Sequence, residues 1–196
     1  MPPAADKRER ILAAAVRVFA RRGFESTRMA DVAREAGVAY GLPYHYFGSK
    51  DAVLRAVFRE AWGRLLAAVA LAEETGETAP EQLGLVVRIV LRVWRDEPDL
   101  VRLLVREVTR SSHISDELDE IGRAFASLER IVRRGQAEGS FRPEADAQLA
   151  AWMLYGALEE VLTGWVLGRL PDDPESALAA EREIVATFLG GLQAPR

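Results

Sequence analysis

The fold of this chain is decided by the segment TRMADVAREAGV, residues 27–38, and by AYGLPYHYF, residues 39–47. Apolar residues spaced three and four apart predict a helix over about 28–36, and a second short helix is expected over about 40–47. Gly37 lies between them, where a residue with positive φ would turn the chain. Two short helices joined by such a turn are typical of the helix-turn-helix, whose second helix fits the major groove of DNA.

The residues on either side of this motif are expected to complete a small helical head. A helix over about 6–22 would bury one apolar stripe and end at Gly23 as its C′ residue. Thr27 is the expected N-cap of the first motif helix, and Ser49 is expected to cap a long helix over about 49–74. The apolar stripe of the first helix consists of Ile11, Ala15, Val18 and Phe19.

Turn signals divide the rest of the chain into segments with helical periodicity, and none shows the period-two alternation of strands. Five more helices are predicted, over about 80–96, 98–111, 115–138, 144–169 and 174–190. The 144–169 helix is apolar around much of its circumference, which predicts a dimer seam completed by the 174–190 helix. The predicted fold is all-α with about nine helices. It comprises a helix-turn-helix DNA-binding domain over 1–50 and a ligand-binding and dimerisation domain over 51–196.

The charges are distributed unevenly along the chain. Residues 1–60 hold eleven Lys and Arg against seven Asp and Glu, a net charge of +4. The remaining residues hold 15 against 23, a net charge of −8, within a total of −4. A basic N-terminal segment followed by an acidic C-terminal segment is typical of a DNA-binding domain joined to a domain that does not contact DNA. Such unevenness also arises by chance.

Sequence motifs for catalysis or metal binding are absent. The chain has two histidines, His45 and His113, no cysteine, and no Gly-x-Ser-x-Gly, HExxH or phosphate-binding glycine loop. We therefore expect neither an enzyme nor a metal or cofactor site. No apolar run approaches the roughly 18 residues that span a bilayer, and the charged start is unlike a secretion signal, so a cytoplasmic protein is expected. The alternative from another class is a helical dimeric interaction protein that does not bind DNA; a steep salt dependence of DNA binding would separate the two.

The stretch from Ile11 to Leu54 resembles the N-terminal domain of the TetR family of transcription repressors. The matching positions are Ile11, Ala14, Ala15, Phe19, Gly23, Thr27, Val32, Ala33, Ala36, Gly37, Val38, Gly41, Tyr44, Tyr46, Phe47, Lys50 and Leu54. The resemblance implies a homodimeric, all-helical repressor that binds a double-stranded DNA operator and releases it when a small hydrophobic effector binds.

The resemblance and the chemistry of the residues together predict a DNA-binding site. Thr27 and Lys50 stand at helix N-termini, where amide donors and the helix dipole favour phosphates. Tyr44 and His45 resemble the pair of residues with which the family contacts the DNA backbone. The alternative for His45 is an exposed helix residue without a role in binding. Tyr40 is the candidate to reach a base edge. Tyr46 and Phe47 are expected in the core. The predicted DNA-binding residues are Thr27, Arg28, Ala39, Tyr40, Gly41, Leu42, Pro43, Tyr44, His45 and Lys50.

Two residues of the 40–47 helix region depart from the family pattern. Ala39 stands where a Ser or Thr N-cap is usual, which forfeits a cap worth about 1 kcal/mol. Pro43 stands where a larger apolar residue is common, and it is expected in the first turn, where its missing N–H costs little. Sequence selection is therefore expected to depend on Tyr40, Leu42 and DNA shape more than on bidentate hydrogen bonds.

The segment YGALEEVLTGWVL, residues 155–167, is similar to the corresponding helix of the family's fatty-acid-responsive branch. That resemblance implies a long-chain acyl-CoA effector and control of fatty-acid metabolism genes; the alternative is a bulky drug-like ligand and an efflux gene. The predicted ligand-binding residues are Trp62, Leu66, Val90, Trp94, Arg102, Leu103, Arg106, Arg110, Phe125, Leu128, Trp152 and Tyr155.

Three of these residues form an arginine row. Arg102, Arg106 and Arg110 are spaced four apart and would share one helix face. The row would hold the phosphates of coenzyme A, or it is a solvated stripe paired with acidic neighbours such as Asp99 and Glu107.

Overall fold

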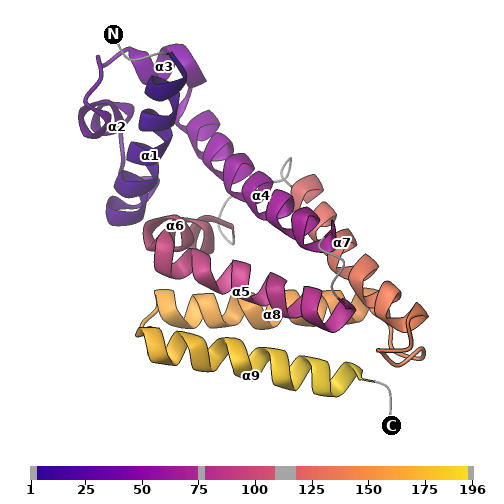
Figure 1. The fold of residues 1–196 in the computed structure, drawn as a ribbon. Coiled ribbons are helices and arrows are strands. Elements are labelled where there is room, and N and C mark those ends of the chain that lie inside the picture. The colour runs from indigo at the N-terminus through magenta and orange to yellow at the C-terminus, as the bar shows by residue number, and fades with distance from the viewer. Residues whose placement is uncertain (1–3, 75–77, 109–117, 194–196) are drawn as a thin grey trace. The chain divides into compact units, whose positions relative to one another are not determined.

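The computed structural model describes residues 4–74, 78–108 and 118–193, and these ranges are helical apart from turns and one bridge between Phe141 and Gln193 (Figure 1). Within the described ranges the all-α prediction is confirmed, and nine helices are present. They are α1 Ala4–Arg22, α2 Met29–Ala36, α3 Leu42–Phe47, α4 Lys50–Glu74, α5 Ala79–Asp96, α6 Pro98–Val108, α7 Leu118–Ala137, α8 Ala147–Val166 and α9 Pro174–Leu192.

The first compact unit, the head, contains α1, α2, α3, the part of α4 up to Ala61, and α6. The predicted stripe of α1 is buried, and the helix ends at Gly23, whose φ is +81°. Helix α6 packs against α1, and the Arg106 guanidinium donates a hydrogen bond from Nη1 to the Ala20 carbonyl at 3.0 Å. The predicted division at residue 50 did not place this helix with the head. The functional assignment of two domains stays a prediction.

The second compact unit, the body, contains α4 from Trp62, α5, α7, α8 and α9. Helices α5, α8 and α9 lie side by side and contact one another (Figure 1). Leu83, Leu154 and Phe141 are among its fully buried side chains. Helix α8 is buried on one side only. The apolar residues on its other side are exposed, as its apolar circumference in the sequence led us to expect.

The starts of α2 and α3 differ from the predicted ones. Thr27 is not the N-cap of α2, because its side chain is buried and its hydroxyl donates to the Gly23 carbonyl at 2.8 Å. Arg28 is the N-cap instead, and its N–H donates to the Asp31 carboxylate at 3.1 Å. Helix α3 begins two residues later than predicted, at Leu42, after a turn that the Leu42 N–H closes onto the Ala39 carbonyl at 2.9 Å.

Two other sequence predictions about helix starts are confirmed. The Ala52 N–H donates to the Ser49 hydroxyl at 3.1 Å, so Ser49 caps α4. Pro43 lies in the first turn of α3. Arg110 and His113, as well as the first predicted residues of the 115–138 helix, lie outside the described residues.

Gly135 on α7 lies in a tightly packed part of the body, where a larger side chain would not fit. A Cβ built at Gly135 would lie 2.2 Å from Cδ2 of the Phe141 ring, and Phe141 is fully buried. Gly135→Ala is therefore expected to lower the free energy of unfolding by about 1–3 kcal/mol, as overpacking does. Gly122→Ala on the same helix is the matched control, because a Cβ there meets nothing within 4 Å. It should be neutral or stabilise by up to about 1 kcal/mol. Urea unfolding at one protein concentration measures both, and equal midpoints would contradict this account.

Candidate nucleic-acid interface

The turn between α2 and α3 fixes the direction in which α3 leaves. Gly37 has φ +64° and ψ +41°, the left-handed conformation in which a glycine ends a helix most readily. The Val38 N–H donates to the Ala33 carbonyl at 3.0 Å and the Gly37 N–H to the Arg34 carbonyl at 3.2 Å. A residue with a Cβ would be strained at Gly37, and the Arg10 guanidinium lies 3.3 Å from the Cβ position.

Helix α3 and the turn before it present aromatic side chains to solvent. Tyr40 is 63% exposed and Tyr44 is 44% exposed, and their ring centroids are 6.2 Å apart. His45 is exposed as well. Two tyrosines and a histidine on this short helix and the turn before it supply hydroxyl and ring N–H donors for phosphates and base edges.

Other predicted interface and core residues take different places. Pro43 is buried and Thr27 is 2% exposed, so these two side chains support the interface from inside the head. Tyr46 and Phe47, which were expected in the core, are only half-buried and are not among the buried core residues of the head. The exposed members of the predicted set are Arg28, Ala39, Tyr40, Gly41, Tyr44 and His45, with Leu42 and Lys50 half-buried.

Lys50 ties the start of α4 to the chain between α1 and α2. Its ammonium donates to the Phe24 carbonyl at 2.8 Å and to the Glu25 carbonyl at 3.3 Å. The same ammonium lies 4.2 Å from the centroid of the Phe24 ring, within the range of a cation–π contact. Lys50 therefore holds the head together, and its predicted phosphate contact stays a prediction.

Ion pairs link α1 to α2. Glu35 accepts hydrogen bonds from Arg17 at 2.9 Å and Arg21 at 2.7 Å, which hold the pKa of its carboxyl below the usual value. The Arg28 N–H, and the nearby Arg22 and Arg34 guanidinium groups, lower the pKa of Asp31 in the same way. Both carboxylates thus stay ionised near neutral pH, and they partly offset the positive charge of the arginines on α1 and α2.

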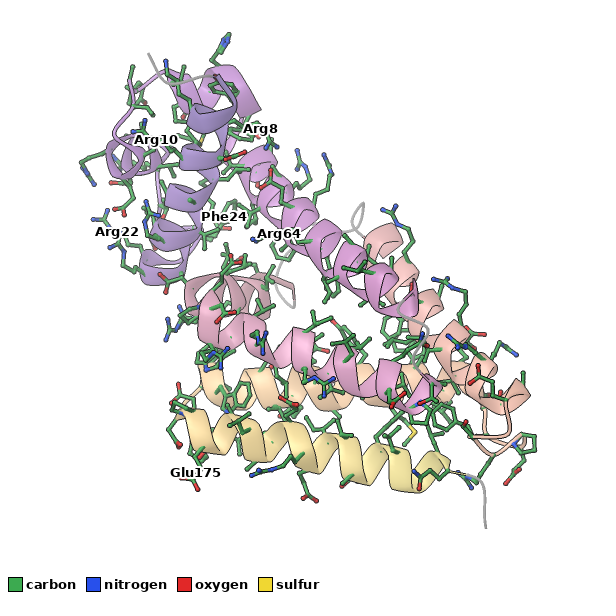
Figure 2. The ribbon with its side chains drawn as sticks, viewed as in Figure 1. Arg8, Arg10, Arg22, Phe24, Arg64 and Glu175 are labelled. Carbon is green, nitrogen blue, oxygen red and sulfur yellow. The ribbon has the colours of Figure 1, made fainter. Side chains whose placement is uncertain are left out.

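Sequence reasoning missed one residue that positions the motif. Arg10 on α1 donates from Nη2 to the Ala36 carbonyl at 2.7 Å, so a cation satisfies the C-terminal end of α2 (Figure 2). The contact joins residues 26 positions apart. A local pattern carries no signal for such a pairing.

The predicted ligand-binding residues are divided between the two units. Leu103 is buried in the head, and Arg102 pairs with Asp99 at 2.9 Å, as the solvated-stripe interpretation expects. Arg106 donates to Ala20, and Arg110 lies outside the described residues. In the body, Trp94 stacks on Trp165 with centroids 6.2 Å apart. Leu66 and Val90 are half-buried and Leu128 is buried.

Four predicted ligand residues do come together, from α4, α7 and α8. We call them the aromatic cluster: Trp62, Phe125, Trp152 and Tyr155. The Phe125 ring centroid is 4.1 Å from that of Trp152 and 4.8 Å from that of Tyr155. Tyr155 in turn stacks on Trp62 at 6.4 Å. Burial, followed by the Glu159 charge, raises the pKa of Tyr155 to about 12.

The described residues hold neither a membrane-spanning helix nor a metal-binding cluster of acidic residues and histidines. Within those residues, no helix is long and apolar enough to cross a membrane. The same part of the chain contains no group of three or more His, Asp or Glu side chains placed to hold a metal ion.

A helix-turn-helix with exposed donors, joined to a helical body, defines a DNA-binding regulator of transcription. Comparison with protein families agrees: residues 11–57 match the family of bacterial regulatory proteins of the tetR type. Residues 80–159 match a tetracyclin repressor-like C-terminal domain. The chain belongs to the TetR family.

Individual relatives share nearly the whole length of the chain. It is 26% identical over 184 residues to the fatty acid metabolism regulator protein of Bacillus subtilis, covering 93% of each chain. The structure of the fatty acid degradation regulator FadR from Bacillus halodurans is 27% identical, with a TM-score of 0.84, and the match covers 94% of this chain and 99% of that one. FadR from B. subtilis in complex with stearoyl-CoA is 25% identical with a TM-score of 0.84, covering 93% and 98%.

Proposed function

We propose that this protein is a homodimeric repressor that binds an operator and releases it when a long-chain acyl-CoA binds the body, thereby controlling fatty-acid metabolism genes. The observation that carries the effector is the similarity, over nearly the full length of both chains, to a regulator whose structure holds stearoyl-CoA. The aromatic cluster supports the same effector class, because an apolar chain is held by apolar and aromatic side chains.

The dimer is supported by the uncovered face of α8. Leu149, Trp152 and Met153 are 58%, 56% and 61% exposed, and Gly156 and Ala157 continue the same face. Positions spaced three, four, seven and eight apart share one side of a helix. A contiguous apolar face of this kind marks an interaction surface. Its occupant is proposed to be a second copy of this chain, because two heads are needed to reach two half-sites on DNA.

A mobility shift on the DNA upstream of the protein's own gene tests the proposal. The purified protein should shift this DNA with a steep salt dependence, and stearoyl-CoA at micromolar concentration should release it. Coenzyme A alone is the control for binding through the nucleotide portion. A shift that stearoyl-CoA leaves intact would reject the effector while keeping the DNA-binding role. The absence of a salt-dependent shift would reject the DNA-binding role at this site.

Tyr40 is proposed to read a base edge, because it is the most exposed aromatic side chain of the motif. Tyr40→Ala is expected to reduce discrimination among operator variants by about 1–3 kcal/mol at the base pair it contacts. Affinity for non-specific DNA should change little, because phosphates supply most of it. Fluorescence anisotropy across single-base operator variants measures the effect, with Tyr40→Phe separating the hydroxyl from the ring. Unchanged discrimination would assign base reading to other residues.

A further inference from the structure

Two buried side-chain donors of the body, Trp62 Nε1 and Arg142 Nε, have no acceptor among the described residues, and Trp62 is the one that belongs to the aromatic cluster. Trp62 on α4 is 8% exposed, and among the described residues no hydrogen-bond acceptor lies within reach of its Nε1. Trp165 shows the ordinary arrangement, because its Nε1 donates to the Pro171 carbonyl at 3.0 Å. Buried donors in folded proteins are nearly always paired, so an unpaired one calls for a specific explanation.

The neighbouring ring does not provide that acceptor. The Trp62 and Tyr155 rings are stacked, with 25° between their planes. An indole N–H lies in the plane of its ring, so in this arrangement it points past the face of Tyr155 rather than into it. The donor is thus held in a fixed direction by aromatic packing, without a partner of its own.

The surroundings of Trp62 favour a neutral acceptor over an anion. Burial raises the pKa of the Tyr155 hydroxyl to about 12, which indicates poor solvation of charge beside the indole. Glu159 lies one turn after Tyr155 on α8, and burial together with Glu160 raises the pKa of its carboxyl. A phosphate or free carboxylate placed beside Tyr155 would lose hydration and meet the same Glu159 charge that raises the pKa of Tyr155. A carbonyl oxygen would incur neither cost.

We propose that Trp62 donates its indole N–H to the thioester carbonyl of the bound acyl-CoA, an inference that rests on the effector proposed above. In an acyl-CoA the thioester joins the apolar chain to the polar carrier. The carbonyl is therefore a neutral acceptor directly beside the part of the ligand that the aromatic cluster suits. This hydrogen bond makes the regulator respond to the activated acyl group and discriminate against ligands that lack its carbonyl.

Paired ligands test the assignment. S-octadecyl-CoA is a thioether that keeps the chain and the carrier of stearoyl-CoA but replaces the carbonyl with a methylene. The wild-type protein is expected to bind stearoyl-CoA about fivefold more tightly than the thioether, the factor that one net hydrogen bond contributes. Trp62→Phe, which keeps an aromatic ring and removes the N–H, should bind the two ligands equally. Trp165→Phe is the matched control and should keep the preference, because that N–H already has an acceptor.

A measurement on the wild-type protein keeps the test independent of how Trp62→Phe folds. The chain has four tryptophans, so ¹⁵N-labelled protein gives four indole N–H resonances. Stearoyl-CoA should move the Trp62 resonance downfield, and the thioether should not. Equal shifts with both ligands, or an unchanged preference in Trp62→Phe, would overturn the thioester assignment while leaving the acyl-CoA response standing. Failure of the wild-type protein to bind either ligand would overturn both.

Discussion

Met153→Glu is expected to convert the proposed dimer into a monomer and to weaken operator binding by about 100-fold or more. Met153 is 61% exposed on the apolar face of α8. Across a two-fold axis, the substitution would bury a pair of glutamates against apolar side chains and against each other. A monomer engages one half-site at a time, so it loses the high effective concentration that the linked second head provides.

Light scattering coupled to size exclusion measures the mass of this variant, and fluorescence anisotropy measures its operator affinity. Leu71→Glu is the matched control, because Leu71 is a similarly exposed apolar residue, at 65%, on α4. It should remain dimeric and keep wild-type affinity. A dimeric Met153→Glu protein would place the seam on another surface.

Two small residues explain why this face suits a second helix. Gly156 and Ala157 follow Met153 by one turn, and a Cβ at Gly156 would meet nothing within 4 Å. Small residues on an exposed helix face allow a facing helix to approach closely, while Leu149 and Trp152 provide apolar area. The polar residue on this face, Glu160, lies beyond the small residues and is exposed.

The helices were predictable from the sequence because their signals are local. Apolar periodicity placed α1, α5 and α9 within a few residues of their observed bounds, and Gly23 and Gly37 marked helix ends correctly. Thr27 shows the limit of such reasoning. Threonine is a favourable N-cap residue, but the Thr27 hydroxyl donates its hydrogen bond to the Gly23 carbonyl, and Arg28 is the N-cap.

The contacts that hold the head together were not predictable, because each depends on tertiary structure. Arg106 reaches the Ala20 carbonyl across 86 positions of the chain. The spacing of the sequence placed Arg106 in a row of arginines. Helical periodicity shows which residues share a face but not what that face packs against. The aromatic cluster was foreseen only as residue types suited to a ligand. The unpaired donor of Trp62 depends on ring orientation, which no sequence pattern encodes.

Lys50→Met is expected to weaken operator binding by about tenfold and to lower the thermal stability of the head. Methionine keeps an apolar stem over the Phe24 ring but removes the ammonium that donates hydrogen bonds to the Phe24 and Glu25 carbonyls. If Lys50 also contacts a phosphate in each head of the dimer, two counterions fewer are released. The slope of log K against log salt concentration should then become shallower by about 2.

The two roles of Lys50 separate in one pair of measurements. Thermal unfolding reports the contacts to Phe24 and Glu25, and a salt titration of operator binding reports the phosphate contact. Arg133→Met is the matched control, because Arg133 is an exposed cation of the body that pairs with Glu129 at 2.6 Å. It should leave the slope unchanged. A lower melting temperature with an unchanged slope would make Lys50 a purely structural residue, and the phosphates would then be bound by other donors of the head, such as Tyr44 and His45.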